Sequence, residues 1–162
     1  MVVARSRRAV ATWTRALRRL APDLSVYGAF SGALKAGLDE KSLNADVATL
    51  AAGDGLVVCG KLETGFDEPR LCCLVVDRVL AAPARLVQVY SRANRVAPNK
   101  PAPRVVDFAN DADAVARAFR RFWRGREVGS GCAHAALGSA AASALALLEA
   151  ASATTLTAAA AA

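Results

Sequence analysis

Two apolar runs without alternation, Leu56–Cys59 and Leu71–Val76, constrain the fold of this chain most strongly. A strand with one solvated face alternates apolar and polar side chains, whereas a strand that is buried on both faces does not. Strands of the second kind occur in parallel sheets that helices cover on both sides. The runs therefore predict an α/β fold with a parallel sheet.

Other predicted strands and helices alternate with these runs. Val10, Trp13, Leu17 and Leu20 recur at helical spacing and are followed by Pro22, which indicates a helix over about 6–20. Further strands are expected at 2–4, 24–30 and 104–108, and further helices at 46–52, 84–95 and 111–125. This alternation predicts a doubly wound sheet with right-handed crossovers and flanking helices.

The chain is long enough for one domain of ordinary size, with 162 residues of which 54% are hydrophobic. We assign residues 1–126 to that domain. Sixteen of the thirty-five residues in 128–162 are Ala, and this segment contains no Lys or Arg. Because so uniform a composition offers little specific packing, residues 127–162 are expected to form a weakly helical or disordered tail.

Positive charge is concentrated in two blocks. Residues 1–35 carry +6 and 85–126 carry +7, while 36–84 carry −4 and 127–162 carry −2, for a net charge of +7. Seventeen of the twenty-one basic residues are Arg. One interpretation is a basic face assembled from both ends of the fold that tracks phosphates; the alternative is a set of solvated helix faces.

The sequence gives little sign of a metal site or of a membrane segment. The four cysteines form no CxxC pair, so neither a zinc site nor a disulfide framework is predicted, and reduced thiols in an intracellular, cytoplasmic protein are the expectation. No unbroken apolar stretch is long enough to span a bilayer. The Arg-rich, acid-free start is also compatible with organelle import, which we weigh as the less favoured alternative.

Two segments carry candidate chemistry. Gly55–Leu62 approaches a phosphate-binding P-loop, but Leu62 lacks the hydroxyl that holds magnesium and its LVVC centre favours a strand, so this interpretation is rejected. Arg92 and Arg95 are three residues apart in a predicted helix, a spacing that presents two guanidinium groups on one face. Without further information, such a pair is more often a solvated face than a polyphosphate site.

The motif order resembles that of a known family. The strings LVVCGKLETGFDEPRLCCLVVDRVL and ARLVQVYSRANRVAPNKPAPRVVDFAN are similar to the second RecA-like motor domain of superfamily-two helicases, most closely that of type I restriction enzyme motor (R) subunits. The resemblance covers roughly residues 1–112 and includes the opening MVVARSRRAV. It implies a RecA-like parallel sheet and a part in an ATP-dependent DNA helicase or translocase.

The resemblance also implies roles for single residues. Arg92 and Arg95 match the arginine fingers, which reach the γ-phosphate of ATP held by a partner domain. The matches to nucleotide-facing positions are Gln88, Gly65 and Asp67. The matches to positions that face the DNA backbone are Ser6, Arg7 and Thr64.

The resemblance implies that the chain supplies one of the two RecA-like domains that such a motor needs. The sequence shows neither a Walker A nor a Walker B motif, so ATP and Mg²⁺ are expected only when a first RecA-like domain completes the site, and the chain alone is expected to be inactive. The expected partners are that domain and double-stranded DNA, with no membrane. A gene fragment, a split protein and a misread frame remain open explanations. The alternative function is a non-enzymatic basic module that binds nucleic acid or a partner.

Overall fold

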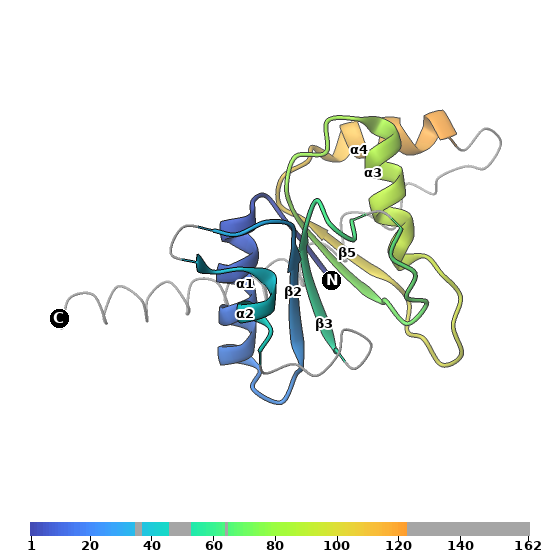
Figure 1. The fold of residues 1–162 in the computed structure, drawn as a ribbon. Coiled ribbons are helices and arrows are strands. Elements are labelled where there is room, and N and C mark those ends of the chain that lie inside the picture. Colours follow the sequence, from blue (N-terminus) through green and yellow to red (C-terminus); the bar gives the residue numbers. More distant parts are fainter. Residues whose placement is uncertain (35–36, 46–52, 64, 123–162) are drawn as a thin grey trace. The chain divides into compact units, whose positions relative to one another are not determined.

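Helices and strands alternate along the chain as the sequence predicts (Figure 1). The computed structural model describes residues 1–34, 37–45, 53–63 and 65–122, which fall within one compact unit, Met1–Arg124. The elements are β1 (Val2–Ala4), α1 (Arg7–Leu20), β2 (Val26–Phe30), α2 (Glu40–Leu43), β3 (Gly55–Cys59), β4 (Cys73–Asp77), α3 (Pro83–Tyr90), the 3-10 helix η3 (Ser91–Ala93), β5 (Arg104–Asp107) and α4 (Ala112–Phe122).

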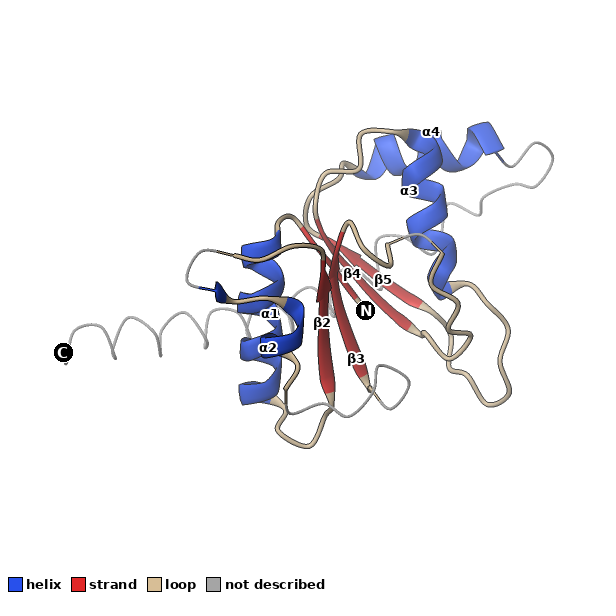
Figure 2. Cartoon of the chain, in the orientation of Figure 1, coloured by secondary structure: helices blue, strands red, loops and turns tan. Residues whose placement is uncertain are grey.

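The five strands form one sheet in the order β2-β3-β1-β4-β5, and every pair of neighbours is parallel (Figure 2). The shortest strand, β1, lies at the centre, where all three of its residues are buried. The predicted α/β class with a parallel sheet and flanking helices is confirmed. The Ala-rich tail expected over 127–162 and the helix expected over 46–52 lie outside the described residues.

Two apolar cores cover the two faces of the sheet. Val2 and Ala4 of β1 pack with α1 on one face, while Val3 between them packs with α3 and α4 on the other. This alternation follows from the two-residue period of a strand. Since both faces are covered, the central strands have no solvated side, which explains the continuous apolar runs.

The two basic helices do not form one surface. The first basic block contributes α1 to one face of the sheet, and the second contributes α4 to the opposite face, as Figure 1 shows. Of the two interpretations of the charge pattern, this placement contradicts a single basic face that includes both helices and favours separate helix faces. Right-handed crossovers place helices on both sides of a doubly wound sheet, and charge totals along the sequence carry no information about which side.

Element boundaries differ from the expected ones at two places. The run Leu71–Val76 enters the sheet only at Cys73, because residues 71 and 72 still belong to the preceding loop. The helix expected over 84–95 divides into α3 and η3, and Asn94 ends the second of these. Neither shift changes the order of the elements.

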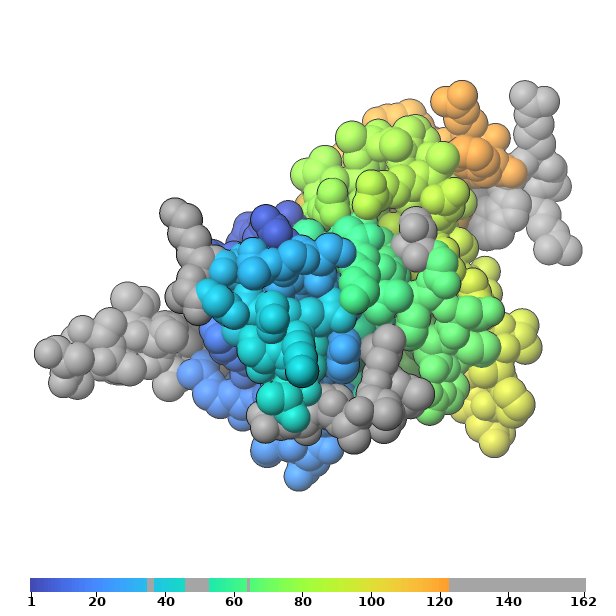
Figure 3. Space-filling view, in the orientation of Figure 1, coloured from blue at the N-terminus to red at the C-terminus, as the bar shows by residue number. Residues whose placement is uncertain are grey.

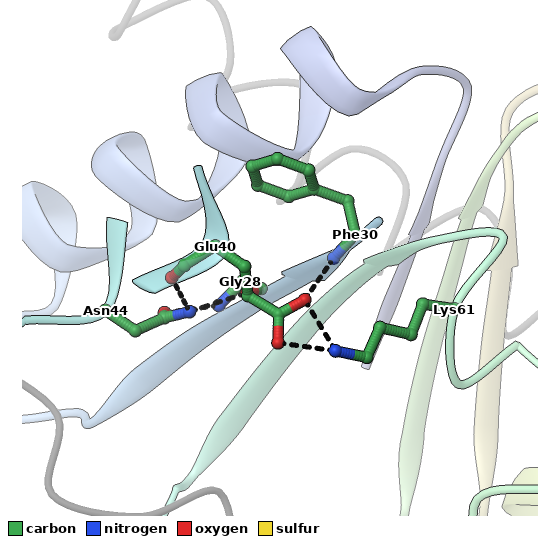
Figure 4. A network of polar contacts seen from close by, with 5 residues as sticks. All are labelled: Gly28, Phe30, Glu40, Asn44 and Lys61. Carbon is green, nitrogen blue, oxygen red and sulfur yellow. Dashed lines mark hydrogen bonds and ion pairs between the residues drawn. The ribbon is translucent and has the colours of Figure 1, made fainter. Parts of the chain in front are cut away.

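Side chains from α1, from α2 and from the C-cap of α2 form hydrogen bonds with the backbone groups on the unpaired edge of β2. The Asn44 amide accepts from Gly28 N at 2.9 Å and donates to Gly28 O at 2.7 Å, and Glu40 accepts from Phe30 N at 2.9 Å (Figure 4). Arg18 donates to Val26 O on the same edge. An edge strand left unpaired is prone to pair with other chains, so these contacts close it.

Position 28 needs glycine for this arrangement. A Cβ there would lie 2.6 Å from Leu43 Cδ2 and 2.8 Å from Thr14 Oγ1, closer than packed atoms allow. The α2 segment also lies beside the residues that follow β3, since Lys61 Nζ donates to Glu40 Oε1 at 2.7 Å. Figure 3 shows this neighbourhood as cyan and green surfaces in contact.

We predict that Asn44→Ala lowers the free energy of unfolding by about 1–3 kcal/mol, because Gly28 N–H and C=O become buried without partners. Urea denaturation followed by circular dichroism measures the change. Asn94→Ala serves as the control, since Asn94 is exposed and should change stability by no more than about 0.5 kcal/mol. Equal stability of the two variants would contradict the role of Asn44 at the strand edge.

Candidate functional site

The loop between β3 and β4 begins with a sharp reversal. Gly60 and Leu62 have φ values of 74° and 62°, in the left-handed region that a leucine rarely adopts. This reversal turns the Glu63 side chain inward, where it is fully buried. The backbone strain at Leu62 is held in place by the contacts of Glu63.

Glu63 lies at the centre of an ion cluster in which its carboxylate is fully buried and its two arginine partners are partly exposed. Its carboxylate accepts from Gly60 N at 2.5 Å, from Arg78 Nη1 at 2.7 Å and from Arg85 Nη2 at 2.5 Å. Burial alone would raise the pKa of Glu63, but the Gly60 N–H and the guanidinium groups of Arg85 and Arg78 outweigh it, so the pKa lies below its ordinary value. The cluster fastens the loop to the end of β4 and the start of α3.

The carboxylates at the ends of β4 and β5 also have internal partners. Asp77 Oδ2 accepts from Trp13 Nε1 at 3.0 Å, which links β4 to α1. Asp107 accepts from the Tyr90 hydroxyl and from the backbone N–H of Asn110. Burial and the bond to Asp107 raise the pKa of Tyr90. These groups hold the carboxyl edge of the sheet together.

Arg92 and Arg95 differ from their expected placement. Arg92 lies in η3 and Arg95 follows it, so the two do not share a face of one α-helix. Figure 1 shows α3 running back from the carboxyl edge of the sheet, so both arginines, which follow α3, come after its far end. Both have partners within the chain: Arg92 Nη1 donates to Phe66 O at 2.8 Å, and Arg95 forms an ion pair with Asp67.

The path of the loop after β3 explains why Arg92 and Arg95 have partners within the chain. The loop after β3 reaches the end of α3 before it enters β4, and it offers these two arginines a backbone carbonyl and a carboxylate. The pairing is loose, because the Asp67 side chain is 71% exposed. Arg92 Nε is buried without a hydrogen-bond partner, so this guanidinium is incompletely satisfied.

The remaining nucleotide-facing candidates are Gly65 and Gln88. Gly65 has a φ of 79° and no atom within 4 Å of the position that a Cβ would take, so the loop is open there. Gln88 is exposed on α3. Asp67, Arg92 and Arg95 are thus brought together, while Thr64 lies outside the residues that the structure describes.

Ser6 and Arg7 lie at the end of β1 and are held by other contacts. Ser6 Oγ accepts from Ala9 N at 3.1 Å and caps α1. Arg7 Nη1 donates to Ser31 O at 3.2 Å and stays exposed. Both residues therefore have local structural roles, and Arg7 keeps further donors for an outside acceptor.

The rejected P-loop segment forms an ordinary strand. Residues 55–59 are β3, paired on both sides, and Lys61 Nζ binds Glu40. Figure 4 shows Lys61 reaching across to α2. This agrees with the prediction that LVVC favours a strand.

The sequence missed Glu63, Arg78 and Arg85 as a group. The available signal was a carboxylate directly after a buried strand together with two arginines after the next strand, but sequence alone does not show which charges are buried. Among the described residues, no group of three or more His, Cys, Asp or Glu side chains is arranged to hold a metal ion. No described helix combines the length and the apolar character needed to cross a bilayer.

A comparison with protein families gives a match for residues 31–110 to type I restriction enzyme subunit R domain 3. The matched segment contains Gly65, Asp67, Gln88 and both arginines, and it ends beyond β5. No curated protein matches the chain.

We predict that Glu63→Gln lowers the free energy of unfolding by about 2–4 kcal/mol, because two guanidinium groups lose their shared carboxylate. Glu68→Gln is the control, since Glu68 pairs with Arg70 at the surface and such pairs contribute about 0–1 kcal/mol. Thermal and urea unfolding of both variants measure the difference. Equal effects would contradict the buried cluster.

The same cluster predicts a pH dependence. The native pKa of Glu63 lies below the ordinary value of 4.5, so its contribution is complete above pH 4.5 and is lost as the pH falls through the native pKa. The difference in unfolding free energy between the native protein and Glu63→Gln should therefore stay constant above pH 4.5 and narrow as the pH falls further. A gap between them that stays constant with pH would contradict this assignment.

Proposed function

We propose that this chain works as the second RecA-like half of an ATP-driven DNA translocase, because residues 31–110 match the type I restriction enzyme subunit R domain 3 family. The observation that carries the proposal is the grouping of Asp67, Arg92 and Arg95 on the loop after β3 and the end of α3. In this family resemblance, all three positions face a nucleotide that the first motor domain holds.

The pairing of Arg95 with Asp67 is compatible with that role. The Arg95 side chain is 33% exposed and Asp67 more than twice as much, and exposed ion pairs contribute only about 0–1 kcal/mol. A phosphate oxygen is therefore able to replace the carboxylate at little cost. The bond of Arg92 to Phe66 O orients its guanidinium while one donor, Nε, stays unsatisfied.

The buried cluster gives this loop a fixed starting point. Glu63 anchors the loop three residues before Phe66, and Arg85 anchors the first turn of α3. The loop that carries Asp67 and the helix that precedes Arg92 are thus both fastened to the Glu63 cluster. Positioning of this kind supports catalysis because charge stabilisation depends on preorganised groups.

The chemistry needs groups that a first motor domain supplies. ATP with Mg²⁺ provides the phosphoryl group, and the residues of this chain would stabilise the negative charge that develops on it. In the proposal, Arg92 and Arg95 donate to oxygens of the γ-phosphate, Asp67 and Gly65 lie near the ribose, and Gln88 contacts the nucleotide or the partner. Ser6, Arg7 and Thr64 would hold the DNA backbone.

We predict that the chain hydrolyses ATP only when mixed with a first RecA-like domain, and that Arg92→Ala and Arg95→Ala each lower this turnover by about 10³-fold or more. A phosphate-release assay at saturating ATP measures the rate. Arg70→Ala is the matched control, since Arg70 is exposed on the same loop and, within the described part of the chain, its side chain pairs with Glu68 alone. It should leave the turnover nearly unchanged.

Two outcomes would overturn the proposal. In one, Arg92→Ala and Arg95→Ala unfold the domain while turnover per folded molecule stays constant, which makes both residues structural. In the other, the chain alone hydrolyses ATP and loses this activity in Lys61→Ala, which points to the near-P-loop segment.

A further inference from the structure

Three arginines on the exposed face of α1 have no acceptor in the described part of the chain. Arg8, Arg15 and Arg19 are exposed, and no hydrogen bond or ion pair of their side chains occurs among the described residues. The other two arginines of α1 are used internally: Arg18 donates to backbone carbonyls of β2 and α2, and Arg7 to the residue after β2. We call the three free arginines the α1 row.

The α1 row is straight. At 100° per residue, Arg8, Arg15 and Arg19 fall within roughly 40° of arc on the helix, and at 1.5 Å per residue the row is about 16 Å long. Val10 and Thr14, which are buried against the sheet, lie roughly 120–160° around α1 from the row, and the buried Ala11 borders the row on one side. The row therefore presents its charges in one direction, away from the core.

Helix stability explains only one member of the α1 row. The first turn of α1 contains Arg7 and Arg8 and no acidic residue, which opposes the helix dipole. Arg15 and Arg19 are four residues apart and repel each other. Arg19 lies in the last turn of α1, where the helix dipole favours a cation, so helix stability accounts for Arg19 but not for Arg8 or Arg15. The arrangement in α1 fits an external anion.

We propose that the α1 row binds the phosphate backbone of a nucleic acid, as a contact surface separate from Ser6, Arg7 and Thr64. Guanidinium groups match phosphate geometry, and the length of the row equals the axial rise of about five base pairs. This surface needs neither ATP nor a first motor domain, so the proposal does not depend on the motor function. It reads no sequence, because it contacts only the backbone.

An anionic membrane fits the α1 row less well. A helix that lies on a bilayer inserts its apolar face between the lipids, whereas the apolar face of α1 is buried against the sheet. The row remains as a rigid line of charge on a folded domain. That geometry suits a regular polyanion such as a duplex.

The test uses Arg15→Glu in the full chain with a fluorescent DNA duplex. Affinity should fall at low salt, and the slope of log affinity against log salt should become smaller by about one or more, as expected when a phosphate contact is lost. The same variant should unfold at a temperature roughly 1–3 °C higher, because Glu at position 15 pairs with Arg19 one turn later. Weaker binding by a more stable protein separates a contact from a folding defect.

Arg120→Glu is the matched control, since it makes the same charge change on an exposed position of α4. It should leave most of the affinity and the salt slope intact. Arg8→Glu gives a second variant of the row, at a position where the helix dipole favours a carboxylate. It should weaken binding in the same way as Arg15→Glu.

Three results would overturn the proposal. Equal loss in Arg15→Glu and Arg120→Glu would assign the binding to net charge alone. Unchanged affinity in both variants of the row would show that the row does not touch DNA. Binding of the native chain to vesicles of anionic lipid without binding to the duplex would assign the surface to a membrane.

Discussion

Burial of the central strands on both faces is the constraint on which the rest of this structure depends. Val3 of β1, Val58 of β3 and Val76 of β4 are fully buried on one face, and Ala4 and Val57 are fully buried on the other. Such strands have no solvated side and require helices above and below. The loops that leave their carboxyl ends are therefore fixed by a rigid sheet, and the candidate site is built from one of these loops and from the segment after α3.

The polar groups around the sheet fall into two sets with different energetics. Glu63 is fully buried with two arginine partners, so its removal leaves uncompensated charge and the cluster holds the loop after β3 in one conformation. Asp67 and Arg95 meet nearer to the solvent, where an ion pair contributes little and is readily exchanged. A rigid anchor followed by an exchangeable pair is compatible with the proposed charge-stabilising role of this loop. The α1 row is a third kind of surface, whose charges have no hydrogen-bond or ion-pair partner among the described residues.

The sequence predicted the order of the elements well, because continuous apolar runs and helical spacing depend on burial, which is a local property of each segment. Sequence-based prediction did not determine features that depend on how distant segments pack together. The placement of α1 and α4 on opposite faces depends on crossovers, and the partners of Arg92 and Arg95 depend on where the loop after β3 runs. Helix α2 escaped detection because a helix of four residues shows no periodicity; its Asp39 and Ser42 capping box was the available signal. The family resemblance predicts that Asp67 and the two arginines face the same nucleotide, but it gives no indication that Asp67 and Arg95 pair with each other.

The most direct test of the motor assignment is the affinity of this chain for a first RecA-like domain, measured by calorimetry with and without ADP and aluminium fluoride, which mimic the phosphate in transfer. If Arg92 and Arg95 reach the phosphate, the transition-state mimic should tighten the association by at least about tenfold, corresponding to about 1.4 kcal/mol, and the gain should vanish in Arg92→Ala and Arg95→Ala. An affinity that is the same with and without the mimic, or a gain that survives both substitutions, would contradict the assignment.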